Sequence, residues 1–384
     1  MLSWWLHFRY HTIDANPDRP LRSYMEYIDS LPMNADPEMF GLHPNANISC
    51  DRGETYDMFD ILLSLQPRTA TSGTRTREEE IARAVAALRT RLPGNFDLDT
   101  INAKFPVKYE ESMNTVLVQE CLRYNKLLAV MKATLKSLAK ALIGQLVMSE
   151  ELERLGASLY DQKVPALWEA RAFPSLKPLA AWSNELIDRL DFVDNWATAG
   201  APPCFWISGL FFPQAFLTGT LQNYARKYKL PIDTLSFDFK LLGQDIPTRA
   251  PADGSFIHGL FLEGARWDFS ARTMAESRPK ELYVQRQAGV HSATTYTRYR
   301  FTPLPVLHLV PMPNRSAPES GVYRCPVYKT LSRRGTLSTT GHSTNFVIFI
   351  ELVSNRPSAV NQQGVADCST WVKAGVAAFC ALRY

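Results

Sequence analysis

The sequence predicts an α+β protein of several domains: a helical module, then a bundle of long helices, then a small antiparallel β-barrel. Before about residue 235, apolar residues recur every three or four positions; after it, short β-rich runs alternate with turn residues. The 384 residues suffice for two or three domains at about 150 residues each. Hydrophobic residues make up 46% and charged residues 21%, which excludes a disordered or fibrous protein.

The first part of the sequence indicates a small helical module. Helical spacing over residues 21–31 and 55–65 predicts two helices, and a Thr/Ser/Gly/Arg linker follows over 69–76. The linker ends in a capping box, because the Thr76 hydroxyl can accept from the Glu79 amide while the Glu79 carboxylate reaches back to Thr76. A third helix is therefore expected to begin directly after Thr76.

A long helix is expected after Pro106. Its apolar positions alternate steps of four and three over about 25 residues, at Leu117, Cys121, Tyr124, Leu128, Met131, Leu135, Leu138 and Leu142. This spacing fits either a dimerising coiled coil or a helix packed within the protein. We favour the packed helix, because four further apolar residues widen the stripe: Val116, Leu127, Val130 and Ile143. Two later helices are expected to end at Gly200 and to begin at Pro213.

Short β-rich runs dominate the last third of the sequence. Turn residues separate them, and no long helix intervenes, which predicts a barrel or sandwich without a repeat architecture. The predicted strands cover residues 235–241, 255–262, 281–285, 306–310, 323–328, 346–352 and 375–382.

Charge and cysteine content narrow the function classes. The net charge of +4, from 42 basic and 38 acidic residues, is too balanced for nucleic-acid binding through bulk electrostatics. The six cysteines form no CxxC pair, so we expect reduced and mostly buried thiols rather than a zinc ribbon. The longest apolar stretch, 204–217, is shorter than the about 20 residues that span a bilayer, so no membrane helix is expected.

Common catalytic and cofactor motifs are absent from the sequence. No Gly-Lys dipeptide occurs, which excludes a P-loop, and no GxGxxG follows a strand. The histidines show no HExxH spacing. The acid Glu351 ends an apolar run that resembles a Walker B strand, but a lone acid at this place is typical of a solvated strand-edge residue. The sequence therefore predicts no catalytic, cofactor-binding or metal-binding residue.

Three weaker patterns have functional and structural interpretations. Gly341-His342-Ser343-Thr344-Asn345 resembles a nucleophile elbow, but Asn345 replaces the last glycine, which favours a polar loop. The pair Arg333-Arg334 could bind phosphate or an acidic partner, although a solvated turn is the more ordinary interpretation. Aromatic residues of 204–217 could line a ligand groove, but core packing is favoured: Phe205, Trp206, Phe211, Phe212 and Phe216.

Two rival functions remain open from such patterns. A stand-alone hydrolase would use Ser343 and His342. A β-barrel interaction or nucleic-acid-binding protein would use basic and aromatic residues together, and the candidates are Arg298, Tyr299, Arg300 and Phe301.

Several strings of the sequence resemble the C-terminal region of dynein heavy chains, of axonemal type. The likeness runs from about residue 20 to the last residue. The strings are FGLHPNANI (40–48), EESMNTVLVQE (110–120), PSLKPL (174–179), FWISG (205–209), FPQAFLT (212–218), HGLFLEGARWD (258–268), CPVYKT (325–330) and RGTLSTTGHSTN (334–345).

The resemblance implies a domain plan. Dynein heavy chains are very large minus-end-directed microtubule motors with a ring of six AAA+ modules. Residues 21–110 would be the helical lid of the sixth module, 111–235 the helical part of the C-terminal domain, and 236–384 its β-barrel part. Residues 1–20 are atypical for the family, because residues 1–10 do not look like the strand expected before Tyr10, so we expect an altered start or a piece of a longer protein.

The resemblance also implies partners and a location. The main ATP and Mg²⁺ sites, the stalk, the linker and the tail of the family lie upstream, so this chain is expected to have no motor or ATPase activity and no cofactor of its own. The expected role is structural and regulatory, bracing the ring. Expected partners are the other AAA+ modules and, through the parent complex, intermediate chains, light chains and microtubules, in the cytoplasm and cytoskeleton, at the axoneme of a cilium or flagellum. Neither nucleic acid nor membrane is expected as a partner, and surface that the ring would cover is expected to be apolar.

Overall fold

The computed structural model describes most of the protein after residue 76. The described residues are 76–243, 245–276, 302–315, 321–331, 333, 344–354 and 369–381, with short pieces at 24–26, 28–29, 51, 54–55, 58–59, 61–62, 283–284 and 298–299. The protein divides into two compact units, and the larger one holds the described helices and sheets from residue 76 onward except residues 369–375. The smaller unit holds the pieces before residue 67, which are helical, and helix α11 (Ser369–Lys373). The predicted domain boundaries at residues 20, 110 and 235 stay a prediction.

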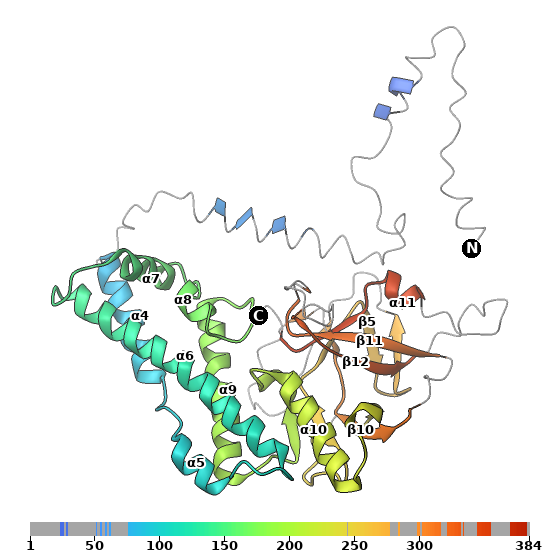
Figure 1. The fold of residues 1–384 in the computed structure, drawn as a ribbon. Helices are drawn as coiled ribbons and strands as arrows, with labels where there is room; N and C mark the ends of the chain where they lie inside the picture. Colours follow the sequence, from blue (N-terminus) through green and yellow to red (C-terminus); the bar gives the residue numbers. More distant parts are fainter. Residues whose placement is uncertain are drawn as a thin grey trace. The chain divides into compact units, whose positions relative to one another are not determined.

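Helix α6 (Ser112–Leu142) is the longest described helix, and the other helices of the larger unit pack along it (Figure 1). They are α4 (Arg77–Arg91), α5 (Leu98–Lys104), α7 (Glu150–Tyr160), α8 (Ala166–Glu169), α9 (Leu179–Ala199) and α10 (Pro213–Tyr228). The predicted capping box opens α4: the Thr76 hydroxyl accepts from the Glu79 amide, and the Thr76 amide donates to the Glu79 carboxylate. No described helix has both the length and the apolarity that crossing a bilayer requires.

The apolar stripe of α6 is buried inside the larger unit, as the packed-helix interpretation predicted. Leu117, Cys121, Tyr124 and Leu128 have no exposed surface. Partners lie on several sides of the helix, which is why the stripe is wider than a coiled-coil seam. Val130 and Leu142 are half-buried, and Ile143, which caps the C-terminus of α6, is 67% exposed.

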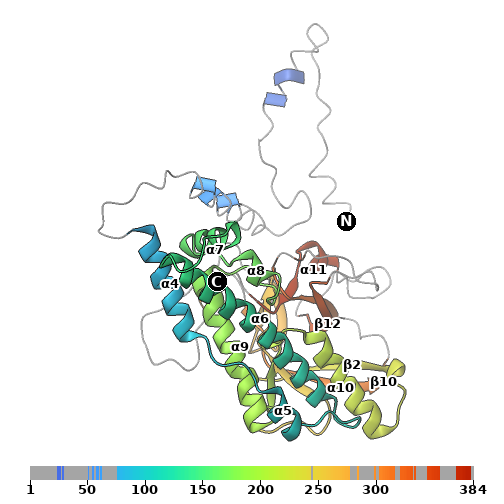
Figure 2. The ribbon, with the colours of Figure 1, turned by 60° about the vertical axis from the view of Figure 1, so that its left-hand side comes forward.

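Helices α9 and α10 end and begin where the sequence predicted. Gly200 caps α9 with φ of 97°, a value that favours glycine, and Pro213 occupies the first turn of α10. In Figure 2, α6, α9 and α10 are seen from a second side, with α5 near one end of α9. Helix α10 packs on α6 and also on strands β2 (Leu235–Leu241), β10 (Leu307–Pro313) and β12 (Phe346–Val353), so it links helices and sheets.

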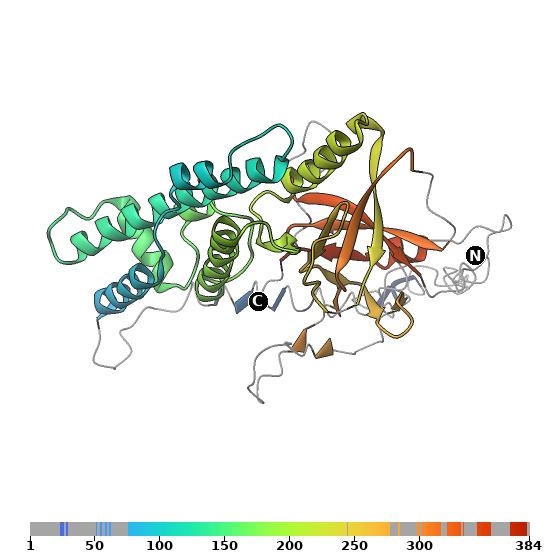
Figure 3. The same ribbon diagram turned by 90° about the horizontal axis from the view of Figure 1, so that it is seen from below.

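The described strands form two main sheets and two small ribbons (Figure 3). One sheet has the order β1-β3-β10-β2, and the other has the order β12-β11-β13-β4-β9. Strands β5 and β6 form a hairpin, and β7 and β8 form a second antiparallel pair. The bounds not yet given are β1 (Cys204–Trp206), β3 (Ser255–His258), β4 (Phe261–Glu263), β5 (Ala265–Asp268), β6 (Thr273–Glu276), β7 (Tyr283–Val284), β8 (Arg298–Tyr299), β9 (Thr302–Pro303), β11 (Val322–Tyr328) and β13 (Ala377–Phe379).

The sheets differ from the predicted strands in three ways. The predicted strand 255–262 is two strands, because Gly259 adopts φ of 94° and carries the backbone from one sheet to the other. Two pairings are parallel, β1 with β3 and β11 with β13, whereas the prediction was purely antiparallel. Strands β1, β5, β6, β8 and β9 were not predicted, because two to four residues carry too little alternation to detect.

Arg315 bridges the two main sheets at β2 and β12. Its Nη1 donates to the carbonyl of Phe237 at 2.8 Å and to Glu351 Oε1 at 2.7 Å, and its Nη2 donates to Asp238 Oδ1 at 3.0 Å. Glu351 on β12 is one of these partners, and its side chain is only 11% exposed, so the expectation of a solvated edge residue was wrong. The described backbone pairings leave the two sheets open here, with no ladder between β2 and β12. The α+β class is confirmed, and closure into a barrel stays a prediction.

Candidate functional site

Residues 207–212 form a short segment clamped between α6 and α9. The segment begins with the 3-10 helix η2 (Ile207–Gly209) and leads into α10. The Tyr124 hydroxyl of α6 donates to the carbonyl of Gly209 at 3.0 Å, and Arg189 of α9 donates to the carbonyl of Leu210 at 3.4 Å. We call this segment, with the side chains that hold it, the buried joint.

Glu120 of α6 binds the next two backbone groups of the segment. Its Oε2 accepts from the amide of Phe211 at 2.5 Å, and its Oε1 accepts from the amide of Phe212 at 3.0 Å. Arg123 lies 3.3 Å from Oε1. Burial raises the pKa of the Glu120 carboxyl, and the two amides and Arg123 oppose that shift. Glu120 has no exposed surface, so its carboxylate serves the backbone of this segment rather than solvent or a ligand.

A buried ion-pair network holds Arg189 in place. Arg189 Nε and Nη2 donate to Glu185 Oε1 at 3.0 and 2.5 Å, and Lys177 Nζ lies 2.9 Å from Glu185 Oε2. Burial would raise the pKa of Glu185, but Arg189 and Lys177 together bring it below its ordinary value. The Arg189 guanidinium also lies over the Phe173 ring, 3.8 Å from its centroid. These contacts fix the orientation of the Arg189 guanidinium, which donates to the buried joint.

Aromatic rings surround the joint. Phe211 meets Tyr124 edge-on at 5.4 Å between centroids and Phe173 edge-on at 6.3 Å. Phe173 stacks on Trp182 at 5.9 Å, and Trp182 stacks on Trp168 at 6.1 Å. These rings exclude water from the polar contacts, which strengthens them electrostatically.

Two glycines make room for Trp206, the residue before the joint. A Cβ at Gly209 would lie 2.4 Å from Trp206 Cε3, and one at Gly259 would lie 2.5 Å from Trp206 Cδ1. The Ser208 hydroxyl donates to the carbonyl of Gly259. Because Gly259 separates β3 from β4, the joint is bonded directly to the turn between the two sheets.

The helix that follows the joint is bonded to the second sheet. Gln214, in the first turn of α10, donates through Nε2 to the carbonyl of Phe346 on β12 at 2.9 Å. Strand β1, which leads into the joint, pairs with β3 in the first sheet. One short segment therefore connects α6, α9, α10 and both sheets.

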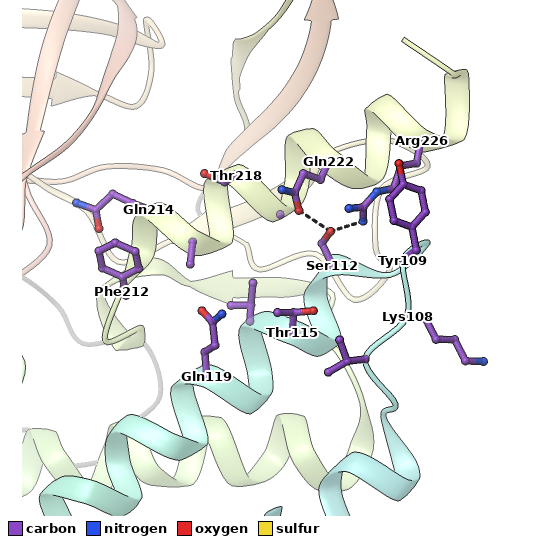
Figure 4. A pocket seen from close by; sticks show the side chains of 14 residues that line it. Lys108, Tyr109, Ser112, Thr115, Gln119, Phe212, Gln214, Thr218, Gln222 and Arg226 are labelled. Atoms are coloured by element: carbon purple, nitrogen blue, oxygen red, sulfur yellow. Dashed lines mark hydrogen bonds between the residues drawn. The ribbon is translucent and has the colours of Figure 1, made fainter. Parts of the chain in front are cut away.

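An open groove lies on the surface beside the joint, between α6 and α10 (Figure 4). Its volume is about 590 Å³. Arg226 Nη1 donates to the Ser112 hydroxyl at 2.6 Å, and that hydroxyl donates to Gln222 Oε1 at 2.8 Å. The groove is lined by Val107, Lys108, Tyr109, Ser112, Thr115, Val116, Gln119, Phe212, Gln214, Ala215, Thr218, Gly219, Gln222 and Arg226.

Some of the weaker sequence patterns lie outside the described residues. His342, Ser343, Arg334, Arg300 and Phe301 lie outside the described residues, so the structure does not test the hydrolase or nucleic-acid hypotheses. Where it can be followed, the end of the first pattern is a structural loop: Asn345 is buried, and it exchanges hydrogen bonds with Thr330.

The remaining patterns lie within the described part of the protein. Arg333 pairs with Glu263 at 3.0 Å. For the aromatic stretch, Phe205 and Phe216 are buried, as the core interpretation predicted, whereas the 38% exposed Phe212 lines the groove.

The described cysteines are buried free thiols, as predicted. Burial raises the pKa of Cys204 to about 11 and those of Cys121 and Cys380 to about 12. Across the described ranges, no cluster of three His, Cys, Asp or Glu side chains could hold a metal ion.

Sequence reasoning missed the buried joint. A signal was present in α9, where Arg189 lies between Leu186 and Leu190 on the apolar face of the helix. A charged residue on such a face must find a buried partner. Only the tertiary structure shows that one partner of Arg189 is the carbonyl of Leu210, 21 residues further along the chain.

The fold and the joint define a mixed helix-and-sheet domain whose buried charged groups bind its own backbone. A protein-family model that describes the C-terminal domain of the dynein heavy chain matches residues 52–380. The protein belongs to the dynein heavy chain family and contains that C-terminal domain.

The sequence is also similar to individual dynein heavy chains from several mammals. The sequence is 50% identical over 378 residues to dynein axonemal heavy chain 1 of Mus musculus, which covers 98% of this chain and 8% of that protein. It is 42% identical to dynein axonemal heavy chain 3 of Homo sapiens, covering 95% of this chain and 8% of that protein. It is also 42% identical to dynein axonemal heavy chain 12 of Rattus norvegicus, covering 96% of this chain and 11% of that protein. The 384 residues thus span about a tenth of the length of these relatives or less.

Proposed function

We propose that this polypeptide acts as the C-terminal segment of an axonemal dynein heavy chain, a minus-end-directed microtubule motor of cilia and flagella. The family match and the axonemal heavy chains among the relatives support this proposal. Motor activity, ATP and Mg²⁺ binding, and association with intermediate chains, light chains and microtubules would belong to the parent protein and its complex. The axoneme would be its location.

Within that motor, we propose a structural and regulatory role: the segment braces the ring of AAA+ modules and performs no chemistry itself. The buried joint is the observation that carries this proposal. Buried and multiply bonded segments resist bending, so a displacement at α6 is passed to the sheets rather than absorbed.

Exposed apolar residues also fit a segment that is covered in a larger assembly. The loop after α6 exposes four apolar side chains: Ile143 (67%), Leu146 (44%), Val147 (86%) and Met148 (43%). An apolar group of this kind is typical of an interaction surface. We propose that neighbouring ring modules cover it.

The finer domain plan belongs to the same proposal. Residues 21–110 would form the lid of the sixth module, and 111–235 the helical part of the C-terminal domain. Residues 236–384 would form its β-barrel, with Arg315 closing the side between β2 and β12 where the described strands have no backbone ladder.

Two measurements test the proposed role. The 384-residue protein alone is expected to show no ATP turnover above background. In the axonemal heavy chain that contains these residues, Glu120→Gln is expected to slow microtubule gliding while nucleotide binding is retained, because the joint no longer holds Phe211 and Phe212 together.

Glu151→Gln is the matched control, since Glu151 is exposed on α7 and makes no contact with the joint. ATP hydrolysis by the isolated 384-residue protein would refute the non-catalytic role. Equal gliding velocities for the wild type and the Glu120→Gln motor would refute the mechanical one.

A further inference from the structure

The groove between α6 and α10 has an unbalanced charge. Its described lining residues include two cations, Lys108 and Arg226, and no carboxylate. Among the ion pairs of the described residues, neither cation has an acidic partner within 4.0 Å. Such a groove favours an anionic occupant.

Two neutral groups, the Tyr109 ring and the Ser112 hydroxyl, orient the Arg226 side chain in the groove. Its guanidinium lies 4.1 Å from the centroid of the Tyr109 ring, and its Nη1 donates to the Ser112 hydroxyl at 2.6 Å (Figure 4). Ser112 is itself held, because its hydroxyl donates to Gln222. Arg226 has five N–H donors, and this arrangement fixes its plane while most of them stay available.

The rest of the groove suits a polypeptide. At Gly219 the two helices approach closely, since a Cβ there would lie 3.3 Å from Met113 Cε and from Val116 Cγ2. Val116 and Gly219 both line the groove, so the two helices are in contact where the groove runs between them. Side-chain amides and hydroxyls on both sides can bind peptide N–H and C=O groups, namely those of Gln119, Thr115 and Thr218.

We propose that the groove binds an extended acidic segment of polypeptide, with an Asp or Glu carboxylate paired to the Arg226 guanidinium. A carboxylate matches the planar fork of arginine and can accept two parallel N–H bonds. Recognition of phosphate-bearing motifs usually relies on clusters of arginines, whereas Arg226 is the single arginine in the described lining of the groove and Lys108 is exposed. A peptide carboxylate is therefore favoured over a phosphate.

Fluorescence anisotropy on the 384-residue protein tests the proposal. The probe is a short fluorescein-labelled peptide in which Glu alternates with Val, and its partner carries Gln in place of Glu. The Glu peptide is expected to bind at least about ten-fold more tightly, with an affinity that falls as salt rises. Arg226→Gln is expected to abolish that preference.

Two further variants separate binding from folding. Arg324→Gln is the matched control, because Arg324 is an exposed arginine that also lies over an aromatic ring, 5.1 Å from the centroid of Phe349, but outside the groove. It is expected to bind both peptides like the wild type. Gln119→Trp places a large ring in the groove at an exposed position and is expected to block the Glu peptide without lowering the unfolding temperature.

Three results would overturn the proposal. Equal affinity for the Glu and Gln peptides would exclude carboxylate recognition. Unchanged binding by Gln119→Trp would place the peptide elsewhere. Displacement of the peptide by inorganic phosphate, at concentrations where acetate has no effect, would make the groove a phosphate site.

Discussion

The carboxylate of Glu120 on α6 accepts the backbone N–H of Phe211 at 2.5 Å, across 91 residues of sequence. The same carboxylate accepts the N–H of the next residue, Phe212. A single buried side chain thus provides the acceptors for two successive amides where the helices meet the sheets.

Glu120→Gln is expected to lower the free energy of unfolding by about 1–3 kcal/mol. The amide side chain keeps one acceptor oxygen, so either the N–H of Phe211 or that of Phe212 loses its acceptor. Chemical denaturation measures the loss. Glu151→Gln, at an exposed position, should change stability by no more than about 0.5 kcal/mol.

Gly209→Ala is expected to destabilise the protein by about 1–3 kcal/mol through overpacking, because its Cβ would lie 2.4 Å from Trp206 Cε3. Gly94→Ala, with no atom within 4 Å of its Cβ, is the control. In a Trp206→Leu background the cost of Gly209→Ala should shrink. A cost equal in both backgrounds would contradict the proposed contact.

Glu185→Gln is expected to cost roughly 3–5 kcal/mol at neutral pH, since Arg189 and Lys177 lose their buried counter-charge. The folded protein holds the pKa of Glu185 below its ordinary value of 4.5. Its contribution is therefore complete above that pH and is lost as the pH falls through the lowered pKa. Denaturation curves from neutral to acidic pH should show the difference between wild type and Glu185→Gln narrowing. A constant difference would contradict the assigned shift.

Arg315→Lys is expected to destabilise the sheets by about 1–3 kcal/mol although the charge is kept. An ammonium cannot reach the Phe237 carbonyl, Asp238 and Glu351 in the geometry of the planar fork. Hydrogen exchange should show faster exchange in β2 and β12, with α4 unchanged. Arg324→Lys, on an exposed arginine, is the control, and equal protection in wild type and Arg315→Lys would refute the bridging role.

Local patterns predicted the helices well, because their signals lie within a few residues. Thr76 and Glu79 identified the start of α4, and Gly200 the end of α9. The split of strand 255–262 at Gly259 was not predicted. A glycine in a β-rich run fits a straight strand as well as a turn, and only the indole of Trp206 and the Ser208 hydroxyl beside it make the turn necessary.

The sequence alone determined the α+β class, the long packed helix and, through long matching strings, the dynein heavy chain family. These three conclusions depend on hydrophobic periodicity, on capping residues and on similarity along the sequence. Tertiary structure decided that Glu120 and Arg189 meet residues 210–212, and that Arg226 lies in a groove with no acidic residue among its described lining. The physical reason is that burial and hydrogen bonding depend on which distant segments come together, and spacing along one segment carries no record of that pairing.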